Sequence, residues 1–325
     1  MRLYLLLLGV MASLSANVGF AQQTVFPSKT VTIVVPYPAG GGVDILGRAM
    51  AERLSVIWGK PVVVENRPGA STIIGSQAVL NAAADGHTLL MTTDATITSN
   101  PHFFAKLPFD PLKDFAPVTK LATFDLMLLA HASVPVSNVE ELLRHARERK
   151  DSLPFASFGN ASQSHIFFAA LGRSRKIELL HIPYAGIAPS LRAVVAGEVM
   201  LSMAGTGSAS GFIQEGRIKA LAIARPSRHP RLPNVPTFAE AGLGDVDPTP
   251  WFGVFTPAAV PLGLRTKIYE DISKVFADKA FEERFIEARG YISLMTPPAQ
   301  FASELVSELA FRGKQIGLSG IKAQD

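Results

Sequence analysis

The chain has 325 residues, of which 48% are hydrophobic and 18% charged, and this balance is typical of a protein that folds around a core, which excludes a disordered or fibrous one. A chain longer than about 250 to 300 residues usually divides into more than one domain, so we expect two. The 31 basic residues exceed the 27 acidic ones by four, and because this small surplus is dispersed along the chain, it argues against binding to nucleic acid.

The first 21 residues have the parts of a secretory signal peptide. Arg2 supplies a positive charge, residues 3–14 are apolar, and Gly19-Phe20-Ala21 places small residues before a cleavage site. A membrane anchor is the alternative, but about 12 apolar residues are too few for a hydrocarbon core that needs ~20. We therefore expect cleavage after Ala21 and a soluble periplasmic product. The chain has no cysteine, which excludes disulfides, thiol catalysis and thiolate metal sites.

Strand and helix patterns alternate along the first part of the mature chain. Runs of β-branched residues are separated by segments with apolar side chains at helical spacing. Strands are expected at 30–36, 61–65 and 87–92, and helices at 43–57 and 73–83. Such alternation predicts a parallel sheet with helices on both faces.

A second α/β unit follows the long apolar stretch at residues 118–130. Apolar runs again alternate with segments of helical periodicity. Strands are expected at 153–157, 177–182, 198–203 and 218–224, and helices at 138–149, 162–173 and 187–196. Residues 205–211 contain three glycines and are interpreted as a flexible turn.

A proline-rich segment leads to the last part of the chain. Six prolines between residues 226 and 250 exclude a regular helix or a central strand over most of residues 225–250, which we interpret as a connection. A strand is then expected at 251–255, followed by helices at 262–277, 279–288 and 298–317. Both units contain a strand, a glycine turn and a helix in that order, which suggests two α/β lobes that face each other.

The strongest local signal is the segment from Tyr37 to Asp44 (YPAGGGVD), which ends a strand and begins a helix. Its glycines allow a sharp turn that directs several amide N–H groups to one point, where the helix dipole adds positive potential. Anions bind at such places, although a tight turn capped by Asp44 would show the same pattern. The known glycine patterns for phosphate are absent, so a carboxylate is as plausible a guest as a phosphate.

Two further polar clusters follow strands. Residues 157–165 (SFGNASQSH) bring hydroxyl, amide and imidazole groups to the start of a helix, where they suit an oxyanion or simply cap the helix through Ser162. Residues 92–96 (TTDAT) follow the third strand. Ligands of open α/β sheets bind at the carboxyl ends of strands, so three clusters at such ends indicate one ligand site.

The sequence contains no recognisable catalytic or metal-binding motif. No GxSxG elbow and no HExxH or comparable spacing of histidines and carboxylates occurs. His165 beside Ser162 could serve as a base, but a histidine in the first turn of a helix is more often structural. We therefore expect no enzymatic activity, no metal and no cofactor.

Six motifs together resemble the Bug family of periplasmic solute-binding proteins, which are the receptors associated with tripartite tricarboxylate transporters. The resemblance extends over essentially the whole mature chain. The motifs are VPYPAGGGVDILGR (35–48), PVVVENRPGA (61–70), ADGHTLLM (84–91), LPFDPLKDFAPVT (107–119), HIPYAG (181–186) and LPNVPTFAEAGL (232–243).

The resemblance implies an α/β fold similar to type II periplasmic binding proteins, with two lobes and a ligand cleft between them. Domain 1 would comprise residues 22–122 and 252–325, and domain 2 residues 123–251. In the family, loop amides, hydroxyls and waters bind the carboxylate of a small organic acid or amino acid. The matching ligand-binding positions are Tyr37, Gly41, Gly42, Asp44, Thr93, Ser157, Gly159, Asn160, Ser164 and His165.

Two positions depart from the family pattern. Asp94 stands where relatives often have asparagine, and Ala204-Gly205 stands where they often have Asp-Asn. We count Asp94 among the ligand-binding candidates because its carboxylate could contact a cationic or hydroxylated ligand. It could also cap the turn that follows.

The loops and the resemblance together imply a receptor, and a receptor of this shape works as a monomer. It would close around a small carboxylate and present the closed form to the membrane subunits of a tripartite tricarboxylate transporter, while hinge segments near 121–125 and 250–256 move. Two alternatives remain open. One is a sensory adaptor of the same fold that signals ligand occupancy to a membrane receptor. The other is a secreted enzyme acting on a small acid, which would need a nucleophile, acid–base pair or metal that the spacing does not offer.

Overall fold

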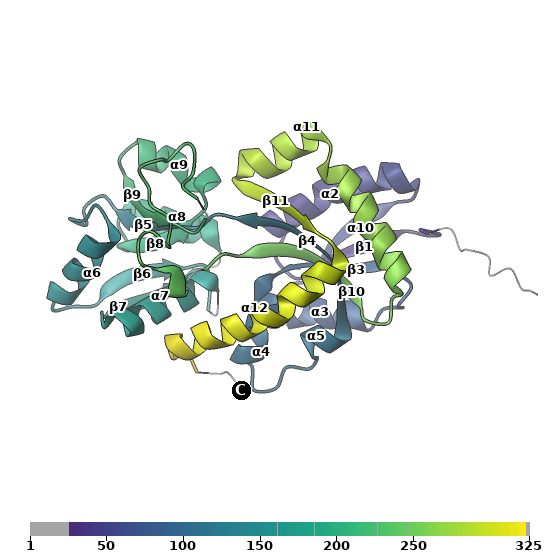
Figure 1. Ribbon diagram of the computed structural model, residues 1–325, viewed down its shortest axis with the longest axis horizontal. Helices are drawn as coiled ribbons and strands as arrows, with labels where there is room; N and C mark the ends of the chain where they lie inside the picture. The colour runs from purple at the N-terminus through teal and green to yellow at the C-terminus, as the bar shows by residue number, and fades with distance from the viewer. Residues whose placement is uncertain (1–25, 161, 185, 226, 247, 323–325) are drawn as a thin grey trace, which may run out of the picture.

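The computed structural model describes residues 26–322 apart from residues 161, 185, 226 and 247. The expected signal peptide and its cleavage site lie outside the described residues. Two α/β lobes lie side by side, and long strands run from one toward the other through the middle of the molecule (Figure 1). Within the described ranges, no helix combines the length and apolar character that a membrane crossing needs.

A six-stranded sheet forms the first lobe, in the order β11-β4-β10-β3-β1-β2. Its strands are β1 (Val31–Val35), β2 (Val62–Asn66), β3 (Thr88–Thr93), β4 (Phe115–Phe124), β10 (Trp251–Pro257) and β11 (Tyr291–Thr296). β1 pairs in parallel with β2 and β3, whereas β10 is antiparallel to β3 and β4, and β11 is antiparallel to β4. The expectation of a parallel sheet is therefore wrong beyond the first three strands, because β4 and β10 run in opposite directions on their way to and from the other lobe.

The second lobe contains a five-stranded sheet in the order β7-β6-β8-β5-β9. Its strands are β5 (Met127–His131), β6 (Leu153–Ser157), β7 (Leu179–Pro183), β8 (Leu201–Ala204) and β9 (Ile218–Ile223). β6 is parallel to both β7 and β8, while β5 is antiparallel to β8 and β9. Both sheets are mixed, and the α/β class with two lobes is confirmed.

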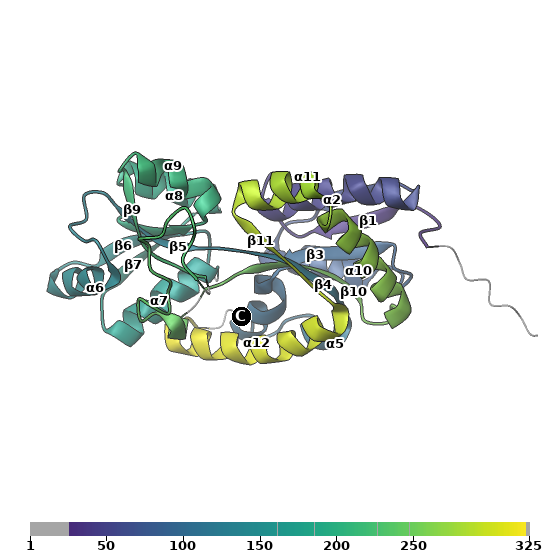
Figure 2. The same cartoon turned by 45° about the horizontal axis from the view of Figure 1, so that its top comes forward.

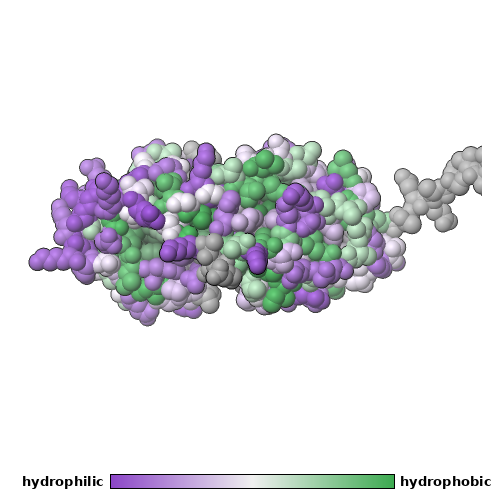
Figure 3. Space-filling model, turned by 90° about the horizontal axis from the view of Figure 1, so that it is seen from below, coloured by the Kyte–Doolittle hydropathy of each residue, from purple (hydrophilic) through white to green (hydrophobic). Residues whose placement is uncertain are grey.

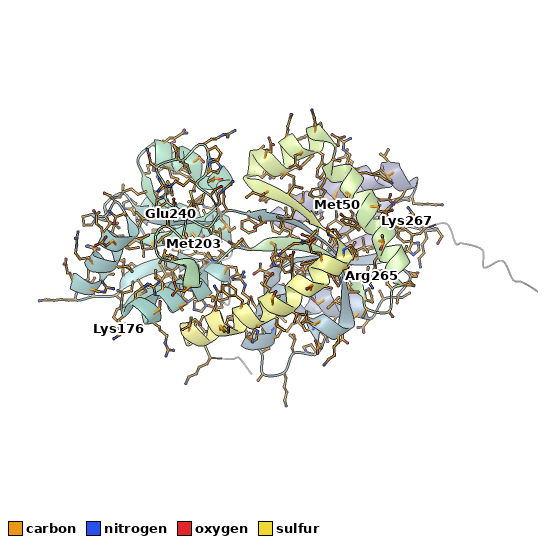
Figure 4. All side chains as sticks on the ribbon, in the orientation of Figure 1. Met50, Lys176, Met203, Glu240, Arg265 and Lys267 are labelled. Carbon is orange, nitrogen blue, oxygen red and sulfur yellow. The ribbon has the colours of Figure 1, made fainter. Side chains whose placement is uncertain are left out.

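Helices cover the two sheets. In the first lobe and at the C-terminus they are α2 (Gly42–Trp58), α3 (Ile73–Leu80), α4 (Asn100–Phe103), α5 (Pro111–Asp114), α10 (Leu262–Phe276), α11 (Lys279–Phe281) and α12 (Pro298–Ser319), and in the second lobe α6 (Val139–Glu148), α7 (Gln163–Arg175), α8 (Ile187–Ala196) and α9 (Thr206–Gln214). Each lobe has its own apolar core. Met50 on α2 and Met203 on β8 are fully buried in these two cores (Figure 4).

Two expectations about elements are corrected. Residues 205–211 are not a flexible turn, since α9 begins at Thr206. The carboxylate of Asp125 accepts hydrogen bonds from the Thr206 amide and hydroxyl at 3.0 Å, and this cap comes from a residue 81 positions away, so local sequence gives no sign of it. The helix expected at 279–288 is broken into α11, a π-helical turn (Glu282–Ile286) and a 3₁₀ turn (Glu287–Arg289).

The two lobes meet at the crossing segments and along α12. The Thr123 hydroxyl donates to the carbonyl of Pro250 at 2.7 Å, and Arg225 lies 3.3 Å from the Asp125 carboxylate, so each crossing chain contacts the other. α12 begins against β4 and ends against α7 of the second lobe, and Figure 2 shows it running along the bottom of both lobes.

Candidate functional site

The loop between β1 and α2 forms the first part of the site. Gly40 has φ +85°, a conformation that glycine adopts readily, and its amide donates to the Asp44 carboxylate at 2.9 Å. Gly41 is the N-cap of α2 and offers no side chain to its first turn. The first-turn amides therefore meet no side-chain cap, and the positive end of a 17-residue helix is available to an anion.

The buried carboxylate of Asp44 stabilises this loop. It is 3% exposed, and its carboxylate also accepts hydrogen bonds from Asn66 at 2.9 Å and Arg48 at 3.0 Å. Burial by itself would raise the pKa of Asp44, but the donors around it outweigh that effect and hold its pKa below the ordinary value. The negative charge of Asp44 is thus neutralised within the loop and does not oppose an anion in front of it.

Gly42 lies where a side chain would not fit. A Cβ at this position would stand 2.5 Å from the Tyr291 hydroxyl and 3.4 Å from the ring of Phe252. The aromatic side chains of β10 and β11 therefore pack directly against the start of α2. This close packing fixes the position of the first-turn amides.

Tyr37 joins the first loop to the loop after β3. Its hydroxyl lies 2.8 Å from the Thr93 hydroxyl and 3.5 Å from those of Thr92 and Thr96. Burial raises the pKa of Tyr37, so the phenol stays neutral. The structure thus brings Tyr37 and Thr93 together as expected, and their hydroxyls contact each other.

Asp94 lies deeper than the other candidates. It is 1% exposed, and its carboxylate is 3.5 Å from the guanidinium of Arg312 on α12. Burial raises the pKa of Asp94 to about 7, although the nearby Arg312 favours the ionised form. Arg312 also donates to the carbonyl of Thr249 at 2.7 Å. Asp94 is therefore linked through α12 to the segment that returns from the second lobe.

In the second lobe, the hydroxyls of the loop between β6 and α7 bond to its backbone. Ser157 donates to the carbonyl of Gly159 at 3.0 Å and accepts from its amide at 3.3 Å. Ser164 accepts from the amide of Phe158 at 3.1 Å. Both serines are fully buried, whereas Asn160 is exposed and Gly159 is partly exposed with φ +131°. Among the described residues of this loop, Asn160 is therefore the one that is exposed, and Phe158, Gly159 and Ser162 are partly exposed.

His165 stacks on a second histidine that sequence reasoning missed. The rings of His165 and His181 lie 3.8 Å apart at an angle of 10°, and His181 Nε2 is 2.6 Å from the Ser157 hydroxyl. Burial, and then the neighbouring His181, lower the pKa of His165 to about 4, and burial also lowers that of His181. The HIPYAG motif, which begins at His181, is the only sign of this contact in the sequence.

The start of α8 lies beside this loop and lacks a side-chain cap, whereas Ser162 caps α7 by accepting from the amide of His165. Gly186, with φ +114°, is the N-cap of α8 and offers no side chain. A Cβ on Gly159 would lie 3.7 Å from the carbonyl of Tyr184, so the two loops are adjacent. The second lobe thus presents the first-turn amides of α8 beside the loop between β6 and α7. Among the described residues no group of three or more histidine or acidic side chains could hold a metal ion.

Comparison with known proteins identifies relatives over nearly the whole chain. The family model described as the tripartite tricarboxylate transporter family receptor matches residues 46–317. A relative from Pseudomonas sp. (strain P51), described as a UPF0065 protein in the tcbD-tcbE intergenic region, is 36% identical over 273 residues, which are 83% of this chain and 81% of the relative.

Three solved structures share the fold. The periplasmic binding protein BugD has a TM-score of 0.79 at 27% identity and covers 92% of this chain and 100% of its own. R. palustris Rpa4515 with adipate has a TM-score of 0.82 at 28% identity, covering 92% and 100%. MatC from Rhodopseudomonas palustris with bound malate has a TM-score of 0.78 at 30% identity, covering 90% and 100%.

Proposed function

The chain belongs to the tripartite tricarboxylate transporter family of receptors, which are periplasmic solute-binding proteins, and from that premise we propose that it captures a small dicarboxylate between its two lobes. The observation that carries this proposal is the start of α2, where Gly41 leaves the first-turn amides without a side-chain cap. Fixed partial charges at such a helix end bind a carboxylate without a charged side chain.

The second lobe would bind the other carboxylate. Its loop at residues 157–164 and the uncapped start of α8 are adjacent, and the start of α8 offers backbone N–H groups beside the exposed Asn160. One carboxylate on each lobe would stabilise the closed arrangement only when the ligand spans both, which is how ligand binding shifts such an equilibrium. The adipate and malate in the two Rhodopseudomonas palustris structures are dicarboxylates, which supports this ligand class.

Side-chain hydroxyls would act mainly by fixing the loops. Tyr37 and Thr93 contact each other, and Ser157 and Ser164 bond to backbone groups of their own loop. Asn160 is exposed and would meet the ligand directly. Asp94 and His165 would act from behind the loops, since Asp94 pairs with Arg312 and His165 stacks on His181.

The same proposal includes the processing, domains and partners of the protein. Cleavage after Ala21 would release a monomer whose first domain comprises residues 22–122 and 252–325 and whose second comprises residues 123–251. The sheets support these limits, because β4 and β10 belong to the first sheet and β5 to β9 to the second. The closed form would dock on the membrane subunits of a transporter, and the protein would catalyse no reaction.

Thermal unfolding of the protein purified from the periplasm tests the ligand class. The panel would contain dicarboxylates of four to six carbons, monocarboxylates of equal length, tricarboxylates and amino acids. Ligand at 100 times its dissociation constant stabilises by ~2.7 kcal/mol and raises the melting temperature by a few degrees. A shift confined to dicarboxylates would support the proposal. A shift confined to monocarboxylates or amino acids would overturn it, as would no shift from protein that mass spectrometry finds free of bound acid.

A further inference from the structure

A groove of about 450 Å³ opens on the second lobe, away from the strand-end loops of the first lobe. It runs between α7 and β7, which is an edge strand of its sheet. Cavities that hold small molecules have volumes of roughly 300 to 1,000 Å³. Figure 3 views the molecule from this lower side, where hydrophobic side chains on the left-hand lobe lie among hydrophilic ones.

One wall of the groove is aromatic. The ring of Phe155 lies 4.4 Å from that of Phe168 and 5.1 Å from that of His181, which in turn stacks on His165 at 3.8 Å. The two phenylalanines are buried and fixed by the core of the lobe. Because burial favours the neutral form of both histidines, the stack carries no charge. Phe155 and Phe168 support it from the core, and His165 and His181, which are partly exposed, are the rings against which another ring can pack.

The other end of the groove is cationic. Arg173 and Lys176 line it, both are exposed, and among the described residues neither has an ion-pair partner. Glu178 lies in the same groove, so the three charged side chains carry a net charge of +1. The Arg173 guanidinium lies against Gly320 at the end of α12, which limits its freedom. Lys176 extends from the lower edge of the lobe (Figure 4).

The spacing along α7 relates the two ends of the groove. At a rise of 1.5 Å per residue, His165 and Arg173 are about 12 Å apart along the helix axis. Ala169 and Gly172 lie between them on the same side of α7 and line the floor. A Cβ on Gly172 would lie 3.2 Å from the carbonyl of Ile177, so the absence of a side chain there lets α7 pack closely on the segment that leads into β7. An aromatic ring joined to a carboxylate through a short chain is shorter than this separation, and the long side chain of Arg173 would reach back along the groove to the carboxylate.

We propose that the groove between α7 and β7 is a second ligand site, which binds an aromatic carboxylate of the size of cinnamate. The ring packs on His165 and His181, which Phe155 and Phe168 support from the core, and the carboxylate lies between Arg173 and Lys176. This site goes beyond the proposed dicarboxylate site, because its charged groups and most of its wall lie outside the strand-end loops.

Nuclear magnetic resonance of the histidine rings tests the site on the protein purified from the periplasm. Cinnamate should shift the ring resonances of His165 and His181 along one saturable curve, whereas hexanoate, which has the charge without the ring, should shift them much less. Absence of the cinnamate shift would overturn the proposal. A hexanoate titration that gave the same dissociation constant as cinnamate would overturn it as well.

Variants locate the binding. Ala169→Trp fills the floor of the groove and should abolish the curve. The double variant Arg173→Gln with Lys176→Gln, which leaves the core intact, should weaken binding about three- to tenfold. The control Arg53→Gln with Lys60→Gln removes the same charge from exposed positions on the first lobe and should leave the affinity unchanged. Unchanged affinity in both groove variants would overturn the assignment.

A variant of the first loop separates this site from the proposed dicarboxylate site. Gly41→Asp places a negative charge at the start of α2 and should leave the cinnamate curve of the histidines intact. If the curve disappears in Gly41→Asp, the shifts arise from the strand-end loops and the groove is not a site. If dicarboxylates fail to bind the unmodified protein while the cinnamate curve persists, the proposed function fails and the groove assignment stands.

Discussion

The N-cap of α2 is the position where one added charge should separate anion binding from folding. Gly41 has φ −77°, which any residue adopts, and a Cβ would meet only the carbonyl of Pro38 at 3.7 Å. An aspartate there would accept hydrogen bonds from the first-turn amides and stabilise the helix by about 0.3–1 kcal/mol. Its carboxylate would occupy the place of the ligand carboxylate, so Gly41→Asp should bind far more weakly while folding at least as well.

The size of the effect follows from the hydrogen bonds that the ligand loses. A carboxylate gains about 1.5 kcal/mol or more from each charge-assisted bond, so two first-turn amides are worth about 3 kcal/mol, or roughly two orders of magnitude in the dissociation constant. Repulsion between the two carboxylates would add to this loss. Isothermal titration calorimetry with the dicarboxylate selected by thermal unfolding measures the affinity, and urea unfolding measures the stability.

Gly41→Asn is the matched control. Asparagine caps a helix about as well as aspartate and has nearly the same volume, but it carries no charge. We expect Gly41→Asn to bind more tightly than Gly41→Asp and more weakly than the unmodified chain. If Gly41→Asp retained the unmodified affinity, the ligand carboxylate would not lie at the start of α2, and the reasoning from the uncapped helix would be refuted.

Four further outcomes follow from the same contacts. Gly42→Ala should destabilise by about 1–3 kcal/mol, because its Cβ would lie 2.5 Å from the Tyr291 hydroxyl, and addition of Tyr291→Phe should recover most of the loss in urea unfolding. Burial raises the pKa of Asp94 to about 7, above its unfolded value near 4. The free energy of unfolding therefore falls by up to about 4 kcal/mol as pH rises from 4 to 7. Asp94→Asn should remove that slope from stability measured across this range. Burial lowers the pKa of His165 to about 4, so the pH dependence of its contribution to the free energy of unfolding has the opposite sign. That contribution is fully present above about pH 6.5 and is lost as pH falls. Partial exposure limits the His165 effect to about 1–2 kcal/mol, and His165→Gln should remove it, whereas an unchanged slope would contradict the stacking argument. Ser157→Ala should weaken ligand binding by about 1 kcal/mol in calorimetry, since the Ser157 hydroxyl fixes its loop without reaching the surface.

Local patterns were sufficient for most elements. The run at 153–157 and the periodic segment at 187–196 coincide with β6 and α8 residue for residue. Sequence could not give the direction of β4 and β10, because the period of a strand is the same in parallel and antiparallel sheets. It also missed β11, whose burial is only partial and whose pattern is correspondingly weak.

The wrong interpretation of residues 205–211 has a physical cause. Gly205, Gly207 and Gly211 lower the helix propensity of this segment, and nothing nearby in sequence caps it. The helix forms because Asp125, in the crossing between the lobes, accepts from its first turn at 3.0 Å. A tertiary contact thus overrides local propensity, and single-sequence reasoning has no access to it.

The candidate site was predictable as loops but not as contacts. Glycine and hydroxyl residues at strand ends identified the segments at 37–44, 92–96 and 157–165. The roles of single side chains depend on partners far away in the chain, such as Asn66 on Asp44 and His181 on Ser157. Sequence patterns indicate which residues are buried and where turns lie. The pairs named above form only when distant strands come together in the folded sheets.

Few side chains of the candidate site are left to distinguish one acid from another. The side chains of Asp44 and Ser157 are almost wholly occupied by hydrogen bonds within the protein, so the proposed ligand would meet backbone amides and exposed side chains such as Asn160. Backbone amides recognise the charge of a carboxylate and are nearly indifferent to the rest of the molecule. Under the proposed function, discrimination between acids would then come from the distance between the two lobes when they close, because only an acid of the right length would reach both helix ends.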